Sequence, residues 1–154
     1  MGEGETKPPA VLFACGQNSV RSPMAAALMR QAFGNGFVVA SAGVRKGELD
    51  GFAIAAMNEI GIDIASHEPM TFEELEDLED GLEFDLIVTL APEAHHKALE
   101  LTRTLAVEVE YWPTSDPTAI EGSREQRLDA YRAVRDQLLA RISARFSPSR
   151  QGAV

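Results

Sequence analysis

The sequence predicts an α/β fold, a single three-layer domain with a central four-stranded parallel sheet flanked by helices. Two observations predict it. Four short apolar runs alternate with segments of helical periodicity, an order typical of parallel strands joined by helices that cover both faces of the sheet. The 154 residues contain no internal repeat and no linker. We therefore assign residues 10–146 to one domain and residues 1–9 and 147–154 to flexible tails.

The predicted strands are four runs rich in apolar and β-branched residues. Each run is nearly continuous in apolar character or alternates with polar residues, as buried and half-buried strands do. The runs are residues 10–14, 37–40, 84–90 and 105–111.

The predicted helices lie between these strands and after the last one. In the first helix Met24, Ala27 and Leu28 recur at helical spacing, and Pro23 suits the first turn. The third begins with a Thr-x-x-Glu pattern at Thr71, typical of a capping box. The helical segments are residues 23–33, 52–60, 71–78, 92–101 and 123–146.

Composition excludes several classes of protein. The formal net charge of −10 argues against nucleic acid or an anionic membrane as a partner, because phosphate groups select basic surfaces. No apolar stretch approaches the roughly 18 residues of a membrane span, and no leader opens the chain. One cysteine excludes an internal disulfide, and adjacent His95 and His96 point apart on a helix. We therefore expect a cytoplasmic protein without a metal or other cofactor.

The single cysteine, Cys15, ends the first apolar run and precedes a polar loop and a helix start. In open parallel sheets, ligands bind where strand C-termini lead into helix N-termini. Free N–H groups and the helix dipole bind anions there and stabilise a thiolate over a thiol. The position predicts a reactive thiol in an anion site; the alternative is a buried, inert cysteine, the commoner fate of this residue type.

Two residues at the helix start strengthen the prediction of an anion site. The guanidinium fork of Arg21 matches two oxygens of a tetrahedral oxyanion, and the Ser22 hydroxyl is placed to donate to the sulfur. The short polar run before them allows backbone amides to curl inward. The predicted anion-binding residues are Gly16, Gln17, Asn18, Ser19, Val20, Arg21 and Ser22.

The segment VLFACGQNSVRSPMAAAL resembles the phosphate-binding loop and first helix of the low-molecular-weight protein tyrosine phosphatases and of their relatives, the thioredoxin-coupled arsenate reductases. Further motifs occur in the family's order: SAG at 41–43, GIDIASH at 61–67, FDLIVTL at 84–90, and Asp116-Pro117 before a long final helix. The resemblance covers nearly the whole chain. It implies a phosphate-binding loop directly after the first strand.

The resemblance implies three catalytic residues. Cys15 attacks phosphorus to form a cysteinyl-phosphate, and Arg21 with the loop amides holds the equatorial oxygens. Asp116 protonates the leaving oxygen and then activates water. Nearby Glu121 and Asp129 are the rival carboxylates. 

The resemblance also implies a supporting hydrogen-bond network around the loop, in which Asn suits a left-handed backbone position. The network consists of Asn18, Ser22, Ser41 and His67.

The implied function is a metal-independent phosphatase that hydrolyses phosphomonoesters, either phosphotyrosine-like or small aryl phosphates. Its partner is then a phosphorylated protein or a small phosphate ester, with inorganic phosphate, vanadate or arsenate as inhibitors. The chain departs from the phosphatases in lacking aromatic residues after Asp-Pro and after SAG. Arg45 and Lys46 stand at the second of these places and favour a smaller or more acidic ester. Gln17 replaces a family glycine, and Val20 replaces a second loop cysteine.

Two alternatives remain open. The segment from Asp116 onward also resembles the arsenate reductases, but the positions of their two relay cysteines are Ala91 and Ala98 here. Arsenate reduction therefore requires an external thiol such as glutathione. The other alternative is a non-catalytic module that binds an oxyanion or a phosphoprotein with the same loop.

Overall fold

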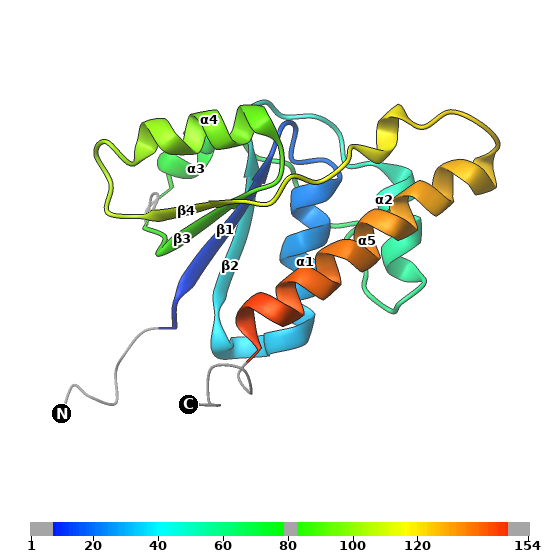
Figure 1. Ribbon diagram of the computed structural model, residues 1–154, viewed down its shortest axis with the longest axis horizontal. Helices are drawn as coiled ribbons and strands as arrows, with labels where there is room; N and C mark the ends of the chain where they lie inside the picture. Colours follow the sequence, from blue (N-terminus) through cyan, green and yellow to red (C-terminus); the bar gives the residue numbers. More distant parts are fainter. Residues whose placement is uncertain (1–7, 79–82, 148–154) are drawn as a thin grey trace.

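The computed structural model describes residues 8–78 and 83–147 and contains a four-stranded sheet. All strand pairs are parallel, and the strand order is β2-β1-β3-β4. Figure 1 shows helices on both faces of this sheet, which confirms the predicted α/β class with three layers. The strands are β1 (Ala10–Cys15), β2 (Val38–Gly43), β3 (Leu86–Thr89) and β4 (Glu108–Tyr111).

The layers follow from the alternation of side chains along β1. Val11, Phe13 and Cys15 belong to the core on one face, with residues of α1, α2 and α5. Leu12 and Ala14 belong to the smaller core on the other face, with residues of α3 and α4. Because β1 is central in the sheet and buried on both faces, its sequence is apolar throughout. The helices are α1 (Arg21–Phe33), α2 (Gly51–Asn58), α3 (Phe72–Glu76), α4 (Pro92–Leu101) and α5 (Arg124–Phe146).

The predicted elements all occur, with shifted ends. β3 begins at Leu86 instead of residue 84; Asp85, directly before it, accepts from the Ala10 amide through its carboxylate. The fourth run was predicted from residue 105, yet β4 begins only at Glu108; Leu105 and Val107 pack on the smaller core from the preceding loop. α3 ends two residues earlier than predicted, at Glu76.

Short connections complete the described chain. The 3₁₀ turns η2 (Gly34–Gly36) and η3 (Pro117–Ala119) precede β2 and the approach to α5.

Among the described helices none is long and apolar enough to cross a membrane. The predicted tails lie mostly outside the described residues, which exclude 1–7 and 148–154.

Candidate active site

The site lies at the C-terminal edge of the sheet, where β1 leads into α1. A pocket of about 100 Å³ opens there beside the Cys15 side chain. Four segments far apart in sequence contribute to it: the loop before α1, the segment after β2, the first turn of α4, and the loop that contains η3. The lining residues are Cys15, Gly16, Gln17, Ser19, Val20, Arg21, Arg45, Glu93, Asp116 and Thr118.

The loop before α1 is held by backbone hydrogen bonds to the segment after β2. Four loop carbonyls accept from amides of that segment, at 2.8–3.2 Å. Since the C=O and the following N–H of one peptide point in opposite directions, the N–H groups that follow these carbonyls point away from the segment after β2. The bonds run from Val44 to Cys15, Arg45 to Gly16, Gly47 to Gln17 and Asp50 to Ser19.

The close approach of these two segments requires a glycine at the end of β2. A Cβ on Gly43 would lie 2.7 Å from the Asn18 backbone nitrogen, closer than side chains tolerate. The glycine of the SAG motif therefore lets the loop lie against the strand end.

Asn18 joins the loop to the rest of the domain. It is buried and has φ 55°, a left-handed conformation that Asn accepts better than most residues. Its Nδ2 donates to Ser22 Oγ at 2.8 Å. Its Oδ1 accepts from the Met70 amide at 2.9 Å and lies 3.1 Å from His67 Nε2. One side chain thus connects the helix start to the segment before α3.

The Ser22 hydroxyl lies 2.9 Å from Cys15 Sγ. Because Ser22 Oγ accepts from Asn18 Nδ2, its own hydrogen is free for the sulfur; the competing acceptor, Ala42 O, lies at 3.5 Å. A hydroxyl directed at sulfur stabilises a thiolate and, later, a departing thiolate. The structure therefore brings together Cys15, Asn18, Ser22 and His67.

His67 is half-buried, and its imidazole is a neutral hydrogen-bond donor to Asn18 at neutral pH. Burial, and secondly the positive charge of Arg30, lowers the pKa of His67 below its ordinary value, while the bond to Asn18 opposes this shift. An imidazole that donates through Nε2 carries its proton there, so the bond to Asn18 Oδ1 selects this tautomer.

Ser41 is the predicted network member that the structure does not join to the others. It lies on β2, opposite Phe13 of β1, and is buried. Its hydroxyl has no hydrogen-bond partner among the described residues.

Arg21 reaches from α1 toward the η3 loop. Its Nη1 donates to Thr114 O at 2.8 Å, and its Nη2 lies 4.0 Å from Asp116 Oδ2. The Arg21 side chain is 13% exposed and the Asp116 side chain 49%. Asp116 otherwise accepts from the amide and hydroxyl of Thr118, two residues on, at 3.0 and 2.7 Å.

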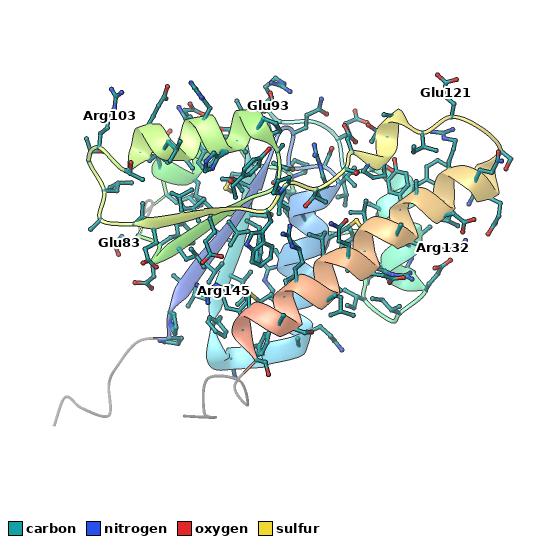
Figure 2. The ribbon with its side chains drawn as sticks, viewed as in Figure 1. Glu83, Glu93, Arg103, Glu121, Arg132 and Arg145 are labelled. Carbon is teal, nitrogen blue, oxygen red and sulfur yellow. The ribbon has the colours of Figure 1, made fainter. Side chains whose placement is uncertain are left out.

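The rival carboxylates lie elsewhere. Glu121 is absent from the pocket lining, and Figure 2 shows it on the outer turn before α5. Asp129 pairs with Arg132 on α5 at 2.6 Å. Asp116 is therefore the carboxylate of these three that reaches the pocket.

Sequence reasoning missed two carboxylates near the loop. Glu93, on the first turn of α4, lines the pocket and pairs with Arg45. Asp50 donates its amide to Ser19 O, caps α2 with its side chain and accepts from Tyr131 OH at 2.9 Å. An Asp directly before an apolar helical run is an N-cap signal, so Asp50 was recognisable as a cap but not as a partner of the loop.

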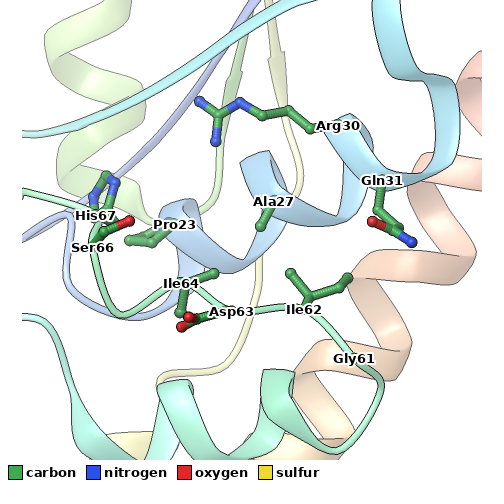
Figure 3. A pocket seen from close by; sticks show the side chains of 10 residues that line it. All are labelled: Pro23, Ala27, Arg30, Gln31, Gly61, Ile62, Asp63, Ile64, Ser66 and His67. Carbon is green, nitrogen blue, oxygen red and sulfur yellow. The ribbon is translucent and has the colours of Figure 1, made fainter.

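A larger cavity of about 390 Å³ lies on the other side of α1, against residues 61–67 (Figure 3). Its walls include Pro23, Ala27 and Arg30 of α1, with His67 at one end. It contains none of Cys15, Arg21 and Asp116, so its size does not make it the candidate active site. Among the described residues no group of three or more His, Cys, Asp or Glu is arranged to hold a metal ion.

Comparison with known proteins agrees with this geometry. The family model for low molecular weight phosphotyrosine protein phosphatases matches residues 10–146, and the chain belongs to this family. Members with this loop are cysteine-dependent enzymes of two kinds, phosphatases and arsenate reductases.

Individual relatives represent both kinds. An arsenate reductase of Shouchella clausii is 36% identical over 132 residues, covering 86% of this chain and 91% of the relative. A low molecular weight protein tyrosine phosphatase from T. tengcongensis superposes with a TM-score of 0.71 at 25% identity, covering 88% and 95% of the two chains. An arsenate reductase in its phosphate-binding state superposes with a TM-score of 0.67 at 26% identity, covering 88% and 95%.

Proposed function

We propose that the protein is a metal-independent phosphatase that hydrolyses phosphomonoesters through a cysteinyl-phosphate intermediate. The observation that carries the proposal is the opening of Cys15, Arg21 and Asp116 onto one small pocket beside the loop before α1. A binding module needs the amides and the arginine, but it needs neither a thiol with a hydroxyl donor nor a carboxylate beside the arginine.

The first step transfers the phosphoryl group to sulfur. The Cys15 thiolate attacks phosphorus, the P–S bond forms, and the bond to the leaving oxygen breaks. The loop amides and Arg21 hold the equatorial oxygens as charge redistributes. Asp116 gives its proton to the leaving oxygen, so an alcohol departs.

The second step returns the enzyme to its starting state. Asp116, now a carboxylate, takes a proton from water, whose oxygen attacks phosphorus. The P–S bond breaks, inorganic phosphate forms, and the sulfur leaves as a thiolate. The 2.9 Å contact between Ser22 Oγ and Cys15 Sγ supports this step, because a hydrogen bond to sulfur makes it a better leaving group.

The second candidate function is arsenate reduction with an external thiol such as glutathione. The names of relatives such as the Shouchella clausii arsenate reductase favour it. Reducing arsenate takes two electrons, supplied when two thiols become a disulfide, and this chain has one cysteine. The relay positions hold Ala91 and Ala98, both buried at α4. The second thiol must therefore come from another molecule.

One screen separates these functions and the non-catalytic alternative. The protein is assayed in EDTA with p-nitrophenyl phosphate, with phosphotyrosine peptides, and with arsenate plus glutathione. We expect hydrolysis of the aryl phosphate, loss of activity after iodoacetate, and competitive inhibition by phosphate, vanadate or arsenate. Arsenite formation without ester hydrolysis would replace the phosphatase with the reductase, and oxyanion binding without turnover would indicate the binding module.

A further inference from the structure

One side of the pocket is an ion pair between two residues that the proposed chemistry does not use. Arg45, in the segment after β2, and Glu93, in the first turn of α4, are joined by two hydrogen bonds, Nη1–Oε2 at 2.7 Å and Nη2–Oε1 at 3.1 Å. Both residues line the pocket with Cys15. Because the pair is bidentate, the orientation of both groups is defined, which a single hydrogen bond would not achieve.

The Glu93 carboxylate lies directly against the phosphate-binding loop. A side chain at Gly16 would collide with Glu93 Oε1, so the carboxylate packs on the bare backbone of that residue. Arg45 is anchored there as well, because its amide donates to Gly16 O at 2.8 Å. The ion pair therefore closes over the first residue of the loop after Cys15.

The carboxylate is charged and faces the cationic part of the pocket. The hydrogen bonds from Arg45, and more weakly the charge of Arg21, lower the pKa of Glu93. An oxyanion held by Arg21 therefore meets a like charge at Glu93, which Arg45 compensates from the outer side.

The closed pair leaves little room. The pocket measures about 100 Å³, whereas pockets that enclose organic ligands typically measure about 300–1,000 Å³. This volume suits a bare oxyanion or a compact ester, and an aryl leaving group must displace the pair. Since the side chains of Arg45 and Glu93 are 56% and 42% exposed, displacement costs little.

We propose that the Arg45–Glu93 pair determines substrate size and charge at this site, admitting compact oxyanions when closed and aryl phosphates only when open. This inference rests on the proposed function for its meaning, but its test relies on binding as well as turnover. It predicts one effect that the two alanine variants share and one effect that is opposite in them. Loss of either partner widens the pocket, whereas the two losses have opposite effects on its charge.

The experiment measures dissociation constants for inorganic phosphate and for phenylphosphonate, an aryl analogue that is not hydrolysed, by calorimetry in low salt. Arg45→Ala and Glu93→Ala should each lower the ratio of the phenylphosphonate constant to the phosphate constant about two- to five-fold, the scale of an exposed ion pair. Glu93→Gln keeps the shape of the side chain and removes its charge, so it should change the ratio less.

The dissociation constant for phosphate by itself tests the effect of the pair on the charge of the pocket. It should fall about two- to five-fold in Glu93→Ala and Glu93→Gln, because a like charge is removed and Arg45 is released. It should rise by a similar factor in Arg45→Ala, which leaves Glu93 uncompensated. If the pair only supported the fold, Arg45→Ala and Glu93→Ala would shift the dissociation constants for phosphate and phenylphosphonate in the same direction.

Matched controls come from two nearby ion pairs outside the pocket. Glu74 is exposed and paired with Lys46 at 2.6 Å, and Lys97 is partly exposed and paired with Glu73 at 3.0 Å. Glu74→Ala and Lys97→Ala make the same changes in net charge and should leave both constants unchanged.

Three results would overturn the inference: an unchanged constant ratio in both alanine variants, same-sign shifts in the phosphate constant, or equal shifts in the controls. Failure of the proposed function is distinguishable from these. In that case the parent protein hydrolyses no aryl phosphate, while the binding ratios still report on the pair. If the parent is active, kcat/KM for p-nitrophenyl phosphate should rise in Glu93→Ala and stay at the parent value in Glu74→Ala.

Discussion

The Cys15–Ser22 loop and the η3 loop around Asp116 face the same pocket, but the fold holds them very differently. The first loop is fixed by four backbone bonds to the segment after β2 and by the buried side chain of Asn18. The second holds its carboxylate through contacts within two residues of itself and a 4.0 Å approach to Arg21. Asp116 is about half exposed, whereas Asn18 and Ser22 are fully buried.

This difference indicates which part of the proposed chemistry tolerates substitution. Preorganised donors act on developing charge only when the surrounding structure holds them in place. A carboxylate on a locally held loop, in contrast, adapts to leaving groups of different shape. We therefore expect substitutions in the first loop to affect every substrate and substitutions at Asp116 to discriminate between substrates.

The largest effect is expected at the nucleophile. Cys15→Ser should reduce p-nitrophenyl phosphate turnover at least about 10³-fold, because a serine hydroxyl is not ionised at neutral pH. Phosphate binding, measured by calorimetry, should persist, since the loop amides and Arg21 remain. Full turnover in this variant would refute the covalent mechanism.

The next effect separates the two loops most directly. Asp116→Ala should reduce kcat about 10²–10⁴-fold on alkyl phosphates, whose leaving oxygen needs a proton. The loss should be much smaller on aryl phosphates that carry strongly electron-withdrawing groups. Glu121→Ala is the control, and if it alone shows this leaving-group dependence, Asp116 is not the acid.

A third prediction concerns the anchor of the first loop. Asn18→Ala removes hydrogen bonds to Ser22 and to the Met70 amide and leaves at φ 55° a residue that tolerates the left-handed conformation less well than Asn. The free energy of unfolding should fall by about 1–3 kcal/mol, and turnover should fall on all substrates alike. Asn18→Gly loses the same bonds but tolerates the backbone, so it should retain part of the stability. Equal stability of the two variants would show that the left-handed conformation contributes nothing.

A fourth prediction uses the titration of His67. Because its folded pKa lies below the ordinary value, the unfolded chain binds a proton first as pH falls below about 6.5. The free energy of unfolding is therefore greatest above that pH and decreases as pH falls through the folded pKa. His67→Gln should reduce this slope in melting temperature between pH 7.5 and pH 5.5. The exposed His96, changed to Gln, should leave it intact; equal slopes in all three proteins would exclude His67 as its source.

The smallest effect is expected at Ser41. Its buried hydroxyl has no partner among the described residues, so Ser41→Ala removes a desolvated polar group without breaking a bond that the structure contains. Turnover should stay within about two-fold of the parent, and stability should be equal or slightly higher. A loss comparable to that of Asn18→Ala would place Ser41 in the supporting network after all.

Sequence pattern and motif order are enough to predict the fold class and the position of the reactive loop. Alternating apolar runs and helical periodicity specify a parallel sheet, and a parallel sheet brings strand ends to helix starts, which places Cys15 and Arg21 together. The ends of the strands were predicted less accurately. Asp85 is hydrogen-bonded to Ala10, and Leu105 and Val107 pack on the smaller core, and neither contact can be read from the local sequence pattern.

Which residues from other elements reach the loop depends on how those elements pack. Asp50 and Glu93 are ordinary charged residues in sequence, and Arg45 stood out only by its place after SAG. The contacts of Asp50 with Ser19, and of Arg45 and Glu93 with Gly16 and with each other, arise where segments far apart in the chain converge. Ser41 matched a family motif, yet its hydrogen-bond state depends on the orientation of one buried hydroxyl. Sequence periodicity fixes the face on which a side chain lies, whereas distances between elements depend on packing, so motif order predicted the candidate nucleophile and packing determined the walls around it.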